Sequence, residues 1–471
     1  MGSQNLIDRR AMLEMTGCGF GALALAGLAS KSATATPFAV GTPHHMPRAK
    51  RVIFLFMQGG PSHVDSFDYK PMLYKKDGEK LQFDDARVLA KTGKKGSSHR
   101  VMKPLWEFQQ HGETGRWVSA LFPHMARHAD DLTMMHSLHT EGVAHGPATL
   151  FLHCGATSFI RPSIGSWLFY GLGSENDNLP GFVSIGPSAG NGGPRNFGSA
   201  FLPPVFQGTA VGKAGDPTIA IRNLTNSNAT PAEQKRLLKF LQEMNRQQYG
   251  SKPLDAELDA VIESYELAWR MQMNAPDVLD INRESKQTLS AYGVDQKTTS
   301  DFGRKCLLAR RLVESGVRYV QVTYGDSSAN PAWDQHSNMP KHAVHAKAVD
   351  QPIGALLADL KQRGLLEDTL VWWGGEFGRT PYAQDNGTGR DHNPNGFTMW
   401  FAGGGTKPGV SHGATDEFGH AAIENKVHMH DLHATILHLL GLDHLKLTYR
   451  YAGRDFRLTD VHGRVVKEIL A

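Results

Sequence analysis

The sequence contains little cysteine, which limits how its fold can be stabilised. Only 3 of its 471 residues are Cys, and Cys18 lies in an N-terminal segment that we expect to be removed. Cys154 and Cys306 remain, so at most one disulfide can form, and neither lies in a CxxC or zinc-ribbon spacing. A fold that depends on a disulfide framework is therefore excluded.

The chain also lacks long apolar runs and a strong charge of one sign. After the first 35 residues, no stretch approaches the run of about 18 apolar residues that a membrane-spanning helix needs. We therefore expect no transmembrane segment in the mature chain. The formal net charge is +4, and the basic residues form no long run. This argues against nucleic acid as a partner, because binding to a phosphate backbone needs concentrated positive charge.

The N-terminal segment has the order of features found in an export signal. Arg9 and Arg10 precede a weakly apolar run rich in Gly and Ala, from Gly17 to Ala29, and residues 33–35 (Ala-Thr-Ala) offer a small-residue cleavage site. We predict that residues 1–35 are a twin-arginine signal peptide and that the protein is periplasmic or secreted. A buried N-terminal helix is the alternative interpretation.

Strand and helix patterns alternate along much of the remaining chain. Apolar, β-branched runs predict strands at 51–57, 132–135, 317–323, 369–373 and 397–402, and amphipathic patterns predict helices at 120–129, 343–363 and 431–440. This alternation predicts an α/β fold with a mostly parallel central sheet and helices on both faces. We assign residues 36–471 to one domain.

Two segments interrupt the alternation. Patterns of long amphipathic helices at 230–248 and 254–273 predict a helical insertion at 225–295. Residues 180–215 are dense in Gly, Pro and Ser, which predicts a long irregular segment that is a candidate lid.

Polar clusters follow three of the predicted strands. Ligands of parallel sheets bind at the carboxyl ends of strands, so these clusters are candidates for one site. Imidazole and carboxylate ligands together favour zinc, manganese or iron over calcium, and we expect zinc or manganese. The candidate metal ligands are His63, Asp65, Asp334, His336, Glu376 and His392.

The same clusters carry a family resemblance. Residues 350–380 resemble the helix, strand and metal-binding turn of the alkaline phosphatase and sulfatase superfamily, with Glu376 at the position of a metal-binding Asp. Residues 430–437 resemble the segment that closes sulfatase domains. The motifs GGPSHVD, WDQH, GEFGRTP and GRDHNP, with the export signal, resemble a bacterial twin-arginine-exported, sulfatase-like family of unknown function. The resemblance covers nearly the whole chain and implies an alkaline phosphatase-like fold.

The chain departs from the superfamily at the positions that carry its chemistry. Gln58 stands where an Asp follows the first strand, and Phe377 replaces the His that would follow the metal-binding Asp. The nucleophile position falls near His145, which leaves two roles open for it: nucleophile, or general base for a water molecule held by the metal. Ser62 is the other candidate nucleophile, and a helix-capping role is its alternative.

These residues lead to two functional hypotheses. The first is a metal-dependent hydrolase of phosphate or sulfate esters, acting on a small anionic ester or a sulfated polysaccharide, in which Arg379 and Arg390 bind the anionic group because a guanidinium matches its oxygens. Arg379 has a pairing with Glu376 as its alternative role. The second hypothesis, favoured by Gln58 and Phe377, is a non-catalytic binding protein of the cell envelope.

Overall fold

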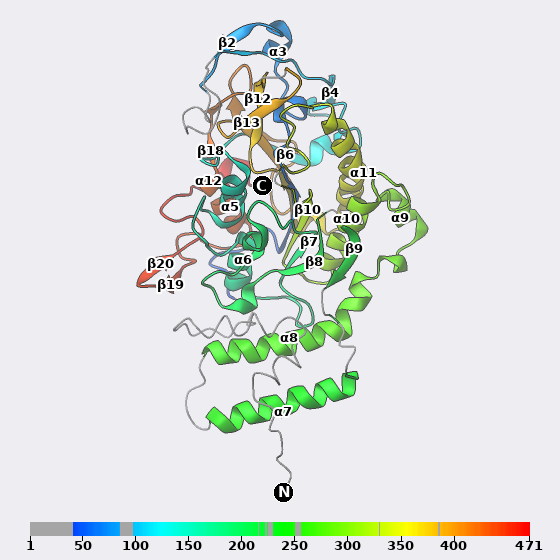
Figure 1. Cartoon of the computed structure of the whole chain (residues 1–471), viewed down its shortest axis with the longest axis vertical. Helices are drawn as coiled ribbons and strands as arrows, with labels where there is room; N and C mark the ends of the chain where they lie inside the picture. Colours follow the sequence, from blue (N-terminus) through cyan, green and yellow to red (C-terminus); the bar gives the residue numbers. More distant parts are fainter. Residues whose placement is uncertain are drawn as a thin grey trace.

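A ten-stranded sheet forms the centre of the computed structural model (Figure 1). The structure describes residues 41–84, 98–214, 216–221, 224, 229–249, 256–328, 330–384 and 387–471, and the predicted signal peptide lies outside them. The strand order is β15-β6-β14-β11-β1-β10-β7-β8-β9, with β18 also pairing with β6. The strands of this sheet are β1 (Arg51–Met57), β6 (Leu132–His139), β7 (Phe182–Ile185), β8 (Thr209–Lys213), β9 (Asp216–Ile221), β10 (Tyr319–Tyr324), β11 (Thr369–Gly374), β14 (Phe397–Ala402), β15 (Ser411–His412) and β18 (Val427–His428).

Most neighbouring strands of the sheet are parallel, as predicted. β1 lies between β10 and β11 and is parallel to both, while β14 is antiparallel to β11 and to β6. Strand β1 is buried on both faces because its apolar run contributes alternate residues to two cores. Its Ile53, Leu55 and Met57 join one core, and Val52, Phe54 and Phe56 join the other.

Helices cover both faces of the sheet, which confirms the predicted α/β architecture. The first core is covered by α10 (Ser300–Glu314) and α11 (Lys341–Gln362), and the second by α5 (His145–Cys154), α6 (Ile164–Leu172) and α12 (Met429–Leu439). The two groups lie on opposite sides of the sheet in Figure 1. No helix of the described residues is long and apolar enough to cross a membrane.

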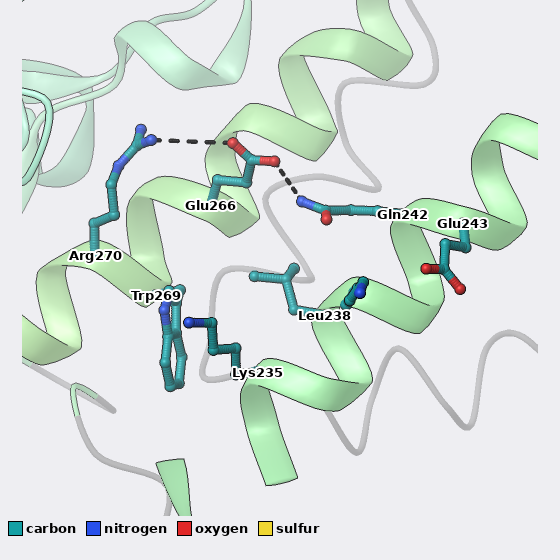
Figure 2. A pocket seen from close by; sticks show the side chains of 8 residues that line it. Lys235, Leu238, Gln242, Glu243, Glu266, Trp269 and Arg270 are labelled. Atoms are coloured by element: carbon teal, nitrogen blue, oxygen red, sulfur yellow. Dashed lines mark hydrogen bonds and ion pairs between the residues drawn. The ribbon is translucent and has the colours of Figure 1, made fainter. Parts of the chain in front are cut away.

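Two long helices lie at one end of the molecule, within the residues predicted as a helical insertion. These are α7 (Pro231–Tyr249) and α8 (Ala256–Leu279), followed by the short α9 (Lys286–Ala291). Leu267, Met271 and Ala275 of α8 pack into the first core. A cavity of about 390 Å³ separates α7 from α8, and Leu238 and Trp269 are among its lining residues (Figure 2).

The candidate lid is partly regular structure, so its prediction as a long irregular segment was wrong. β7 and β8 lie within it and extend the sheet beyond β10 in parallel pairing. The segment Phe182–Ile185 is wholly buried, and flanking Gly and Pro residues hide so short a strand in the sequence. Only the short helices η3 (Gly193–Phe197) and η4 (Pro204–Phe206) interrupt the loop between these strands.

Short elements surround the carboxyl edge of the sheet. They include the hairpin of β12 (Gly378–Ala383) and β13 (Arg390–Asn393) and the hairpin of β4 (Phe108–His111) and β5 (Arg116–Ser119).

The predicted helix at 120–129 is instead a 3₁₀ helix, η2 (Met125–Asp131). The remaining elements are η1 (His63–Asp65), α3 (Pro71–Lys75), β2 (Lys80–Gln82), β3 (Ser98–Arg100), η5 (Ile281–Arg283), η6 (Leu366–Asp368), β16 (Ala414–Thr415), β17 (Ala422–Glu424), β19 (Tyr449–Tyr451), β20 (Arg454–Phe456) and η7 (Lys467–Ile469).

Candidate metal centre

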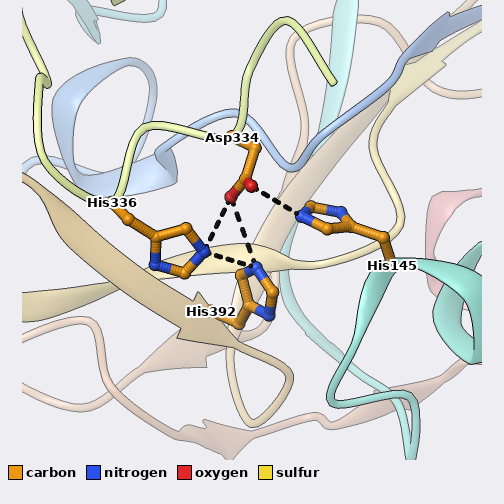
Figure 3. A group of neighbouring side chains, drawn as sticks. All are labelled: His145, Asp334, His336 and His392. Carbon is orange, nitrogen blue, oxygen red and sulfur yellow. Dashed lines mark hydrogen bonds and ion pairs between the residues drawn. The ribbon is translucent and has the colours of Figure 1, made fainter. Parts of the chain in front are cut away.

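Four side chains from distant parts of the chain meet beyond the carboxyl ends of β1 and β11. They are His145, Asp334, His336 and His392, and one ligand atom of each lies within 4.8 Å of those of the others (Figure 3). His145 is the first residue of α5, Asp334 and His336 lie in the loop between β10 and α11, and His392 is on β13. The topology of the sheet therefore brings the predicted strand-end clusters together.

Asp334 lies at the middle of this group and contacts every histidine. Its Oδ2 is 3.2 Å from Nε2 of His145, and its Oδ1 is 2.9 Å from Nε2 of His336 and 3.4 Å from Nε2 of His392. Tetrahedral ligands at about 2.1 Å from a zinc ion lie roughly 3.4 Å apart. The spacing of these four groups fits one metal ion.

The outer nitrogen of each histidine lies within hydrogen-bond distance of an oxygen atom. Nδ1 of His145 lies 2.7 Å from Oε1 of Glu376, and Nδ1 of His392 lies 2.9 Å from the carbonyl oxygen of Val143. Nδ1 of His336 lies 2.5 Å from Oε1 of Gln384. With Nδ1 as the donor, each neutral ring presents the lone pair of Nε2 to the centre, as a metal ligand does.

Two of these inner nitrogens face each other across the centre. Nε2 of His336 is 3.0 Å from Nε2 of His392, and Nε2 of His145 is buried 3.2 Å from Oδ2 of Asp334. Lone pairs at that distance repel unless a cation or a proton lies between them. With both rings protonated on Nδ1, a divalent cation bound by the four side chains would remove this repulsion.

Burial and charge act in opposite directions on the ionisable groups of the centre. Burial alone would raise the pKa of Asp334, but contacts with the three histidines and the charge of Arg379 hold this pKa well below its usual value. Burial lowers the pKa of His392 to about 4, with Arg379 and His145 adding to the effect. Burial opposes a charge on His145, yet Asp334 and Glu376 raise its pKa overall.

Glu376, predicted as a metal ligand, lies behind His145 rather than among the four groups. Its two carboxylate oxygens both accept from the backbone N–H of Gly59, each at 3.0 Å. Gly59 has φ +113°, and a Cβ there would lie 2.7 Å from the backbone nitrogen of Asp334. Glycine at position 59 therefore lets the loop that carries Asp334 pack against the turn after β1, where the backbone N–H of Gly59 binds Glu376.

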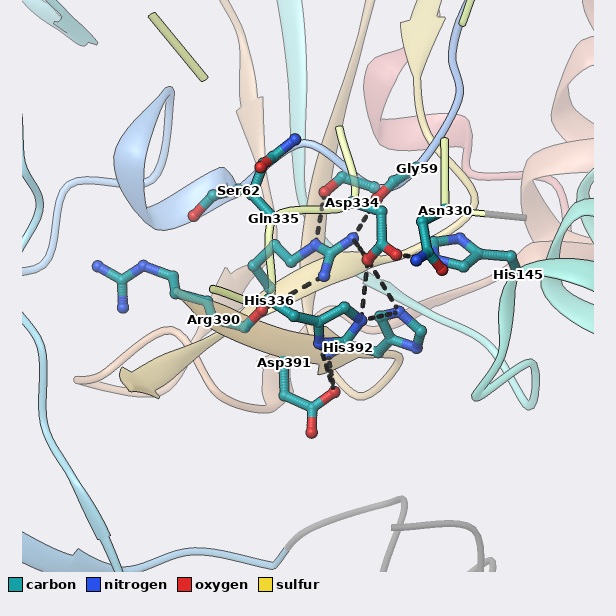
Figure 4. Close-up of polar contacts among 12 residues, drawn as sticks. Gly59, Ser62, His145, Asn330, Asp334, Gln335, His336, Arg390, Asp391 and His392 are labelled. Carbon is teal, nitrogen blue, oxygen red and sulfur yellow. Dashed lines mark hydrogen bonds and ion pairs between the residues drawn. The ribbon is translucent and has the colours of Figure 1, made fainter. Parts of the chain in front are cut away.

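Arg379 is fully buried and contacts Asp334 of the centre. Its Nη2 donates to Oδ1 of Asp334 at 2.7 Å and to the carbonyl oxygen of Gly59, and its Nε donates to the carbonyl oxygen of Gly60 at 2.9 Å (Figure 4). Arg379 pairs in register with His392 across the β12–β13 hairpin. Its predicted alternative partner, Glu376, contacts His145 and Gly59 instead.

The first polar cluster, after β1, forms a separate buried network. Arg390 donates from Nε to Oδ2 of Asp65 at 2.7 Å, and both side chains are fully buried. The hydroxyl of Ser62 donates to the same carboxylate at 2.5 Å and makes no capping bond to the backbone of η1. Nε2 of His63 lies 2.7 Å from the carbonyl oxygen of Gly419. These four side chains are not among the converging ligands.

The two departures from the superfamily lie close to the centre. Phe377 packs its ring 4.3 Å from that of His392 and 5.1 Å from that of His145, measured between centroids, and so shields the imidazoles from water. Gln58 is buried, and neither atom of its carboxamide has a hydrogen-bond partner among the described residues. Sequence patterns gave no indication of Gln384 or of the Val143 carbonyl, because neither belongs to a strand-end motif.

Solved structures of alkaline phosphatase-like and sulfatase-like proteins are similar to this chain. A protein in the alkaline phosphatase superfamily from Vibrio parahaemolyticus is 10% identical with a TM-score of 0.36, over 98% of this chain and 79% of that one. Alkaline phosphatase from the Antarctic bacterium TAB5 is 11% identical with a TM-score of 0.29, over 77% and 94%. The PsFucS1 sulfatase from Pseudoalteromonas sp. is 11% identical with a TM-score of 0.35, over 84% and 68%.

These solved structures belong to the superfamily that the motifs resemble. No curated protein matches the chain in sequence. A family model described as "Protein of unknown function (DUF1501)" matches residues 49–470, and the chain therefore belongs to that family.

Proposed function

We propose that the protein is a metal-dependent hydrolase of phosphate or sulfate esters. The observation that carries the proposal is the convergence of Asp334 with Nε2 of His145, His336 and His392 at the carboxyl edge of the sheet. Three imidazoles and a carboxylate favour zinc or manganese over calcium. When bound, such an ion polarises an ester oxygen and makes water a stronger nucleophile at neutral pH.

The surrounding residues position this centre and limit its access to solvent. Glu376 orients His145, Arg379 orients Asp334, and Phe377 covers the rings of His145 and His392. The His336 side chain is 27% exposed, whereas those of the other three groups are at most 9% exposed. We infer that an ester enters on the His336 side.

Water is a better candidate nucleophile than either predicted side chain. The Ser62 hydroxyl is buried and donates to Asp65, and both ring nitrogens of His145 face carboxylates. We therefore propose direct attack by water, with no covalent intermediate on the protein. Arg379 and Arg390 are fully buried and bound to carboxylates and carbonyls, so we assign them positioning roles instead of contact with the anionic group.

The first test measures metal content and hydrolysis on the same protein. Purified protein is analysed by mass spectrometry for metals and assayed with p-nitrophenyl phosphate and p-nitrophenyl sulfate, before chelation, after it, and after addition of zinc or manganese. His336→Ala should lose both metal and activity, whereas His111→Ala, on the β4–β5 hairpin and outside the four ligands, should lose neither. Full activity in the chelated protein, or in His336→Ala, would contradict the proposal.

A metal-holding binding protein without chemistry is the second candidate. It is favoured by the number of protein ligands, because four of them fill a tetrahedral shell, which is typical of structural zinc sites. A binding protein of this kind should contain one bound metal ion and should become less stable on chelation. It should hydrolyse neither ester. Hydrolysis that depends on the metal would exclude it.

We also propose that the protein is exported by the twin-arginine pathway. The support is the order of Arg9, Arg10, the apolar run and the cleavage site in the sequence. Fractionation of cells that express the full chain should place the protein outside the cytoplasm, without residues 1–35. Replacement of both arginines by Lys should leave it in the cytoplasm, and unchanged export of that variant would disprove the pathway.

A further inference from the structure

A cavity of about 260 Å³ lies beside β6, between the β4–β5 hairpin and the segment that follows η1. At roughly 30 Å³ per water molecule, it has the volume of about nine waters, a space suited to one sugar ring. Its walls combine aromatic, charged and hydroxyl-bearing side chains. They include Asp68, Tyr69, Arg116, Trp117, His136 and Ser411.

Trp117 gives the cavity a rigid aromatic surface. Its side chain points outward from β5 and the residue is 37% exposed, which is unusual for the largest apolar side chain. Tyr69 stacks on it with a centroid distance of 4.3 Å, and Phe108 lies 5.3 Å from Tyr69. The indole is thus held in place from one side and can pack against the C–H face of a ligand.

The buried Asp68 and the half-buried His136 supply hydrogen-bonding groups. Asp68 accepts from the Thr415 hydroxyl at 2.5 Å and pairs with Nζ of Lys70 at 3.2 Å. Nδ1 of His136 lies 3.2 Å from the Thr398 hydroxyl and 3.9 Å from Oδ1 of Asp68. A carboxylate and a neutral imidazole side by side can bind the hydroxyl groups of a sugar.

Arg116 makes the cavity positive. It is 7% exposed and donates to the carbonyl oxygens of Leu132 at 2.7 Å and Val410 at 3.2 Å, while its Nε has no hydrogen-bond partner in the described part of the chain. Among those residues no carboxylate forms an ion pair with Arg116, and the charge of Asp68 is balanced by Lys70. Asp130 acts on this guanidinium through its charge without forming an ion pair, and the buried cation still favours an anionic ligand.

We propose that this cavity binds one ring of an anionic saccharide, with the sugar face on Trp117 and its hydroxyls near Asp68 and His136. A small inorganic anion would make no use of the indole. A flat aromatic ligand without hydroxyl groups would make no use of the carboxylate and the imidazole.

The cavity is linked to the candidate metal centre through the chain itself. β6 carries His136, ends at His139, and continues through the loop that contains Val143 into His145. Val143 accepts from His392 through its carbonyl. The proposal that the bound ring belongs to the hydrolysed substrate rests on the proposed hydrolase function. Binding of the saccharide at the cavity does not depend on that function.

The test uses a singly sulfated galactose disaccharide and its unsulfated counterpart with the whole protein. Isothermal titration should give a Kd about tenfold weaker for Trp117→Ala than for wild type, and weaker for the unsulfated sugar than for the sulfated one. Trp269→Ala, a tryptophan variant in the distant α7–α8 cavity, should bind as wild type does. Binding should also shift the NMR signal of the Trp117 indole N–H.

The outcomes separate this proposal from the hydrolase proposal. Equal affinity of wild type and Trp117→Ala, equal affinity for both sugars, or no binding by wild type would each overturn the saccharide site. Metal-free protein and His336→Ala should still bind the disaccharide. If the wild-type protein hydrolyses p-nitrophenyl esters but does not bind the disaccharide, only this inference is refuted. If it binds the disaccharide but hydrolyses neither ester, only the proposed function is refuted.

Discussion

The Glu376 carboxylate acts on the candidate centre through His145, so its removal should weaken the centre without emptying it. Glu376→Gln keeps the shape of the side chain but replaces one acceptor oxygen by an NH₂ group, which cannot accept from Nδ1–H of His145 or from N–H of Gly59. Loss of such an outer partner typically costs 10- to 100-fold in metal affinity. Competition with a chromophoric chelator would measure this loss.

The matched comparison for Glu376→Gln is His336→Ala, which removes a ligand instead of its support. We expect His336→Ala to lose more affinity than Glu376→Gln, with circular dichroism unchanged in both. If Glu376→Gln binds metal as tightly as wild type, Glu376 does not orient His145. If it binds no metal at all, Glu376 acts as a ligand, as its place in the sequence motif predicted.

The Asp65–Arg390 pair offers a test of a buried charge. Both residues are fully buried, so Asp65→Asn would leave the Arg390 guanidinium without its counter-charge in the interior of the protein. Breaking a buried pair costs about 3–5 kcal/mol. Urea unfolding should show this loss, whereas Asp455→Asn, in an exposed pair with Arg450, should change the unfolding free energy by less than about 1 kcal/mol. Equal losses in the two variants would show that the burial of Asp65 has no energetic effect.

At the residue scale, the sequence predicted three of the side chains that meet at the centre, but it did not separate these ligands from the residues that support them. Asp334, His336 and His392 follow from the strand-end rule, because parallel strands direct their carboxyl ends to one edge. Local sequence does not distinguish Glu376, which contacts a histidine from outside, from a ligand. The same limit applies to Asp65, whose partner Arg390 is distant in the chain.

At the element scale, the strongly periodic segments were predicted almost to the residue. The strands at 51–57 and 397–402 match β1 and β14, and the helix at 343–363 matches α11, with Gly364 at φ +67° after its end. The short strands β7 and β8 were missed because their neighbours in the sheet, and not their own length, stabilise them. The β12–β13 hairpin was missed for a similar reason, since its residues are polar motif residues.

The N-terminus of α12 provides an element-scale prediction. Oδ2 of Asp431 accepts from N–H of His428 at 3.0 Å in a capping box, and its Oδ1 accepts from N–H of Arg464 at 2.6 Å. Asp431→Ala should therefore lower the unfolding free energy by about 1–2 kcal/mol. Asp431→Asn keeps one acceptor oxygen, so urea unfolding should give a smaller loss. If the two variants lower the unfolding free energy equally, the acceptor oxygen that Asn retains contributes nothing to stability.

At the scale of the whole molecule, both faces of the sheet bury histidines that are neutral in the folded state. Burial lowers the pKa of His136, His153 and His433 to about 4 each, against 6.5 for the ordinary side chain. His153 and His433 lie on the face of α5 and α12, and His136 is on β6. Between pH 6.5 and 4 the unfolded chain therefore binds more protons than the folded one.

The sign of this difference makes the fold sensitive to acid. Stability is fully present above pH 6.5 and falls as the pH decreases toward 4, by up to about 1.4 kcal/mol per pH unit for each histidine. Urea unfolding at pH 7, 6 and 5 should show an accelerating loss. His153→Gln should reduce the slope between pH 6 and 5 by about one such increment. A free energy of unfolding that stays constant from pH 7 to 5 would mean that these histidines are not held neutral by the two cores.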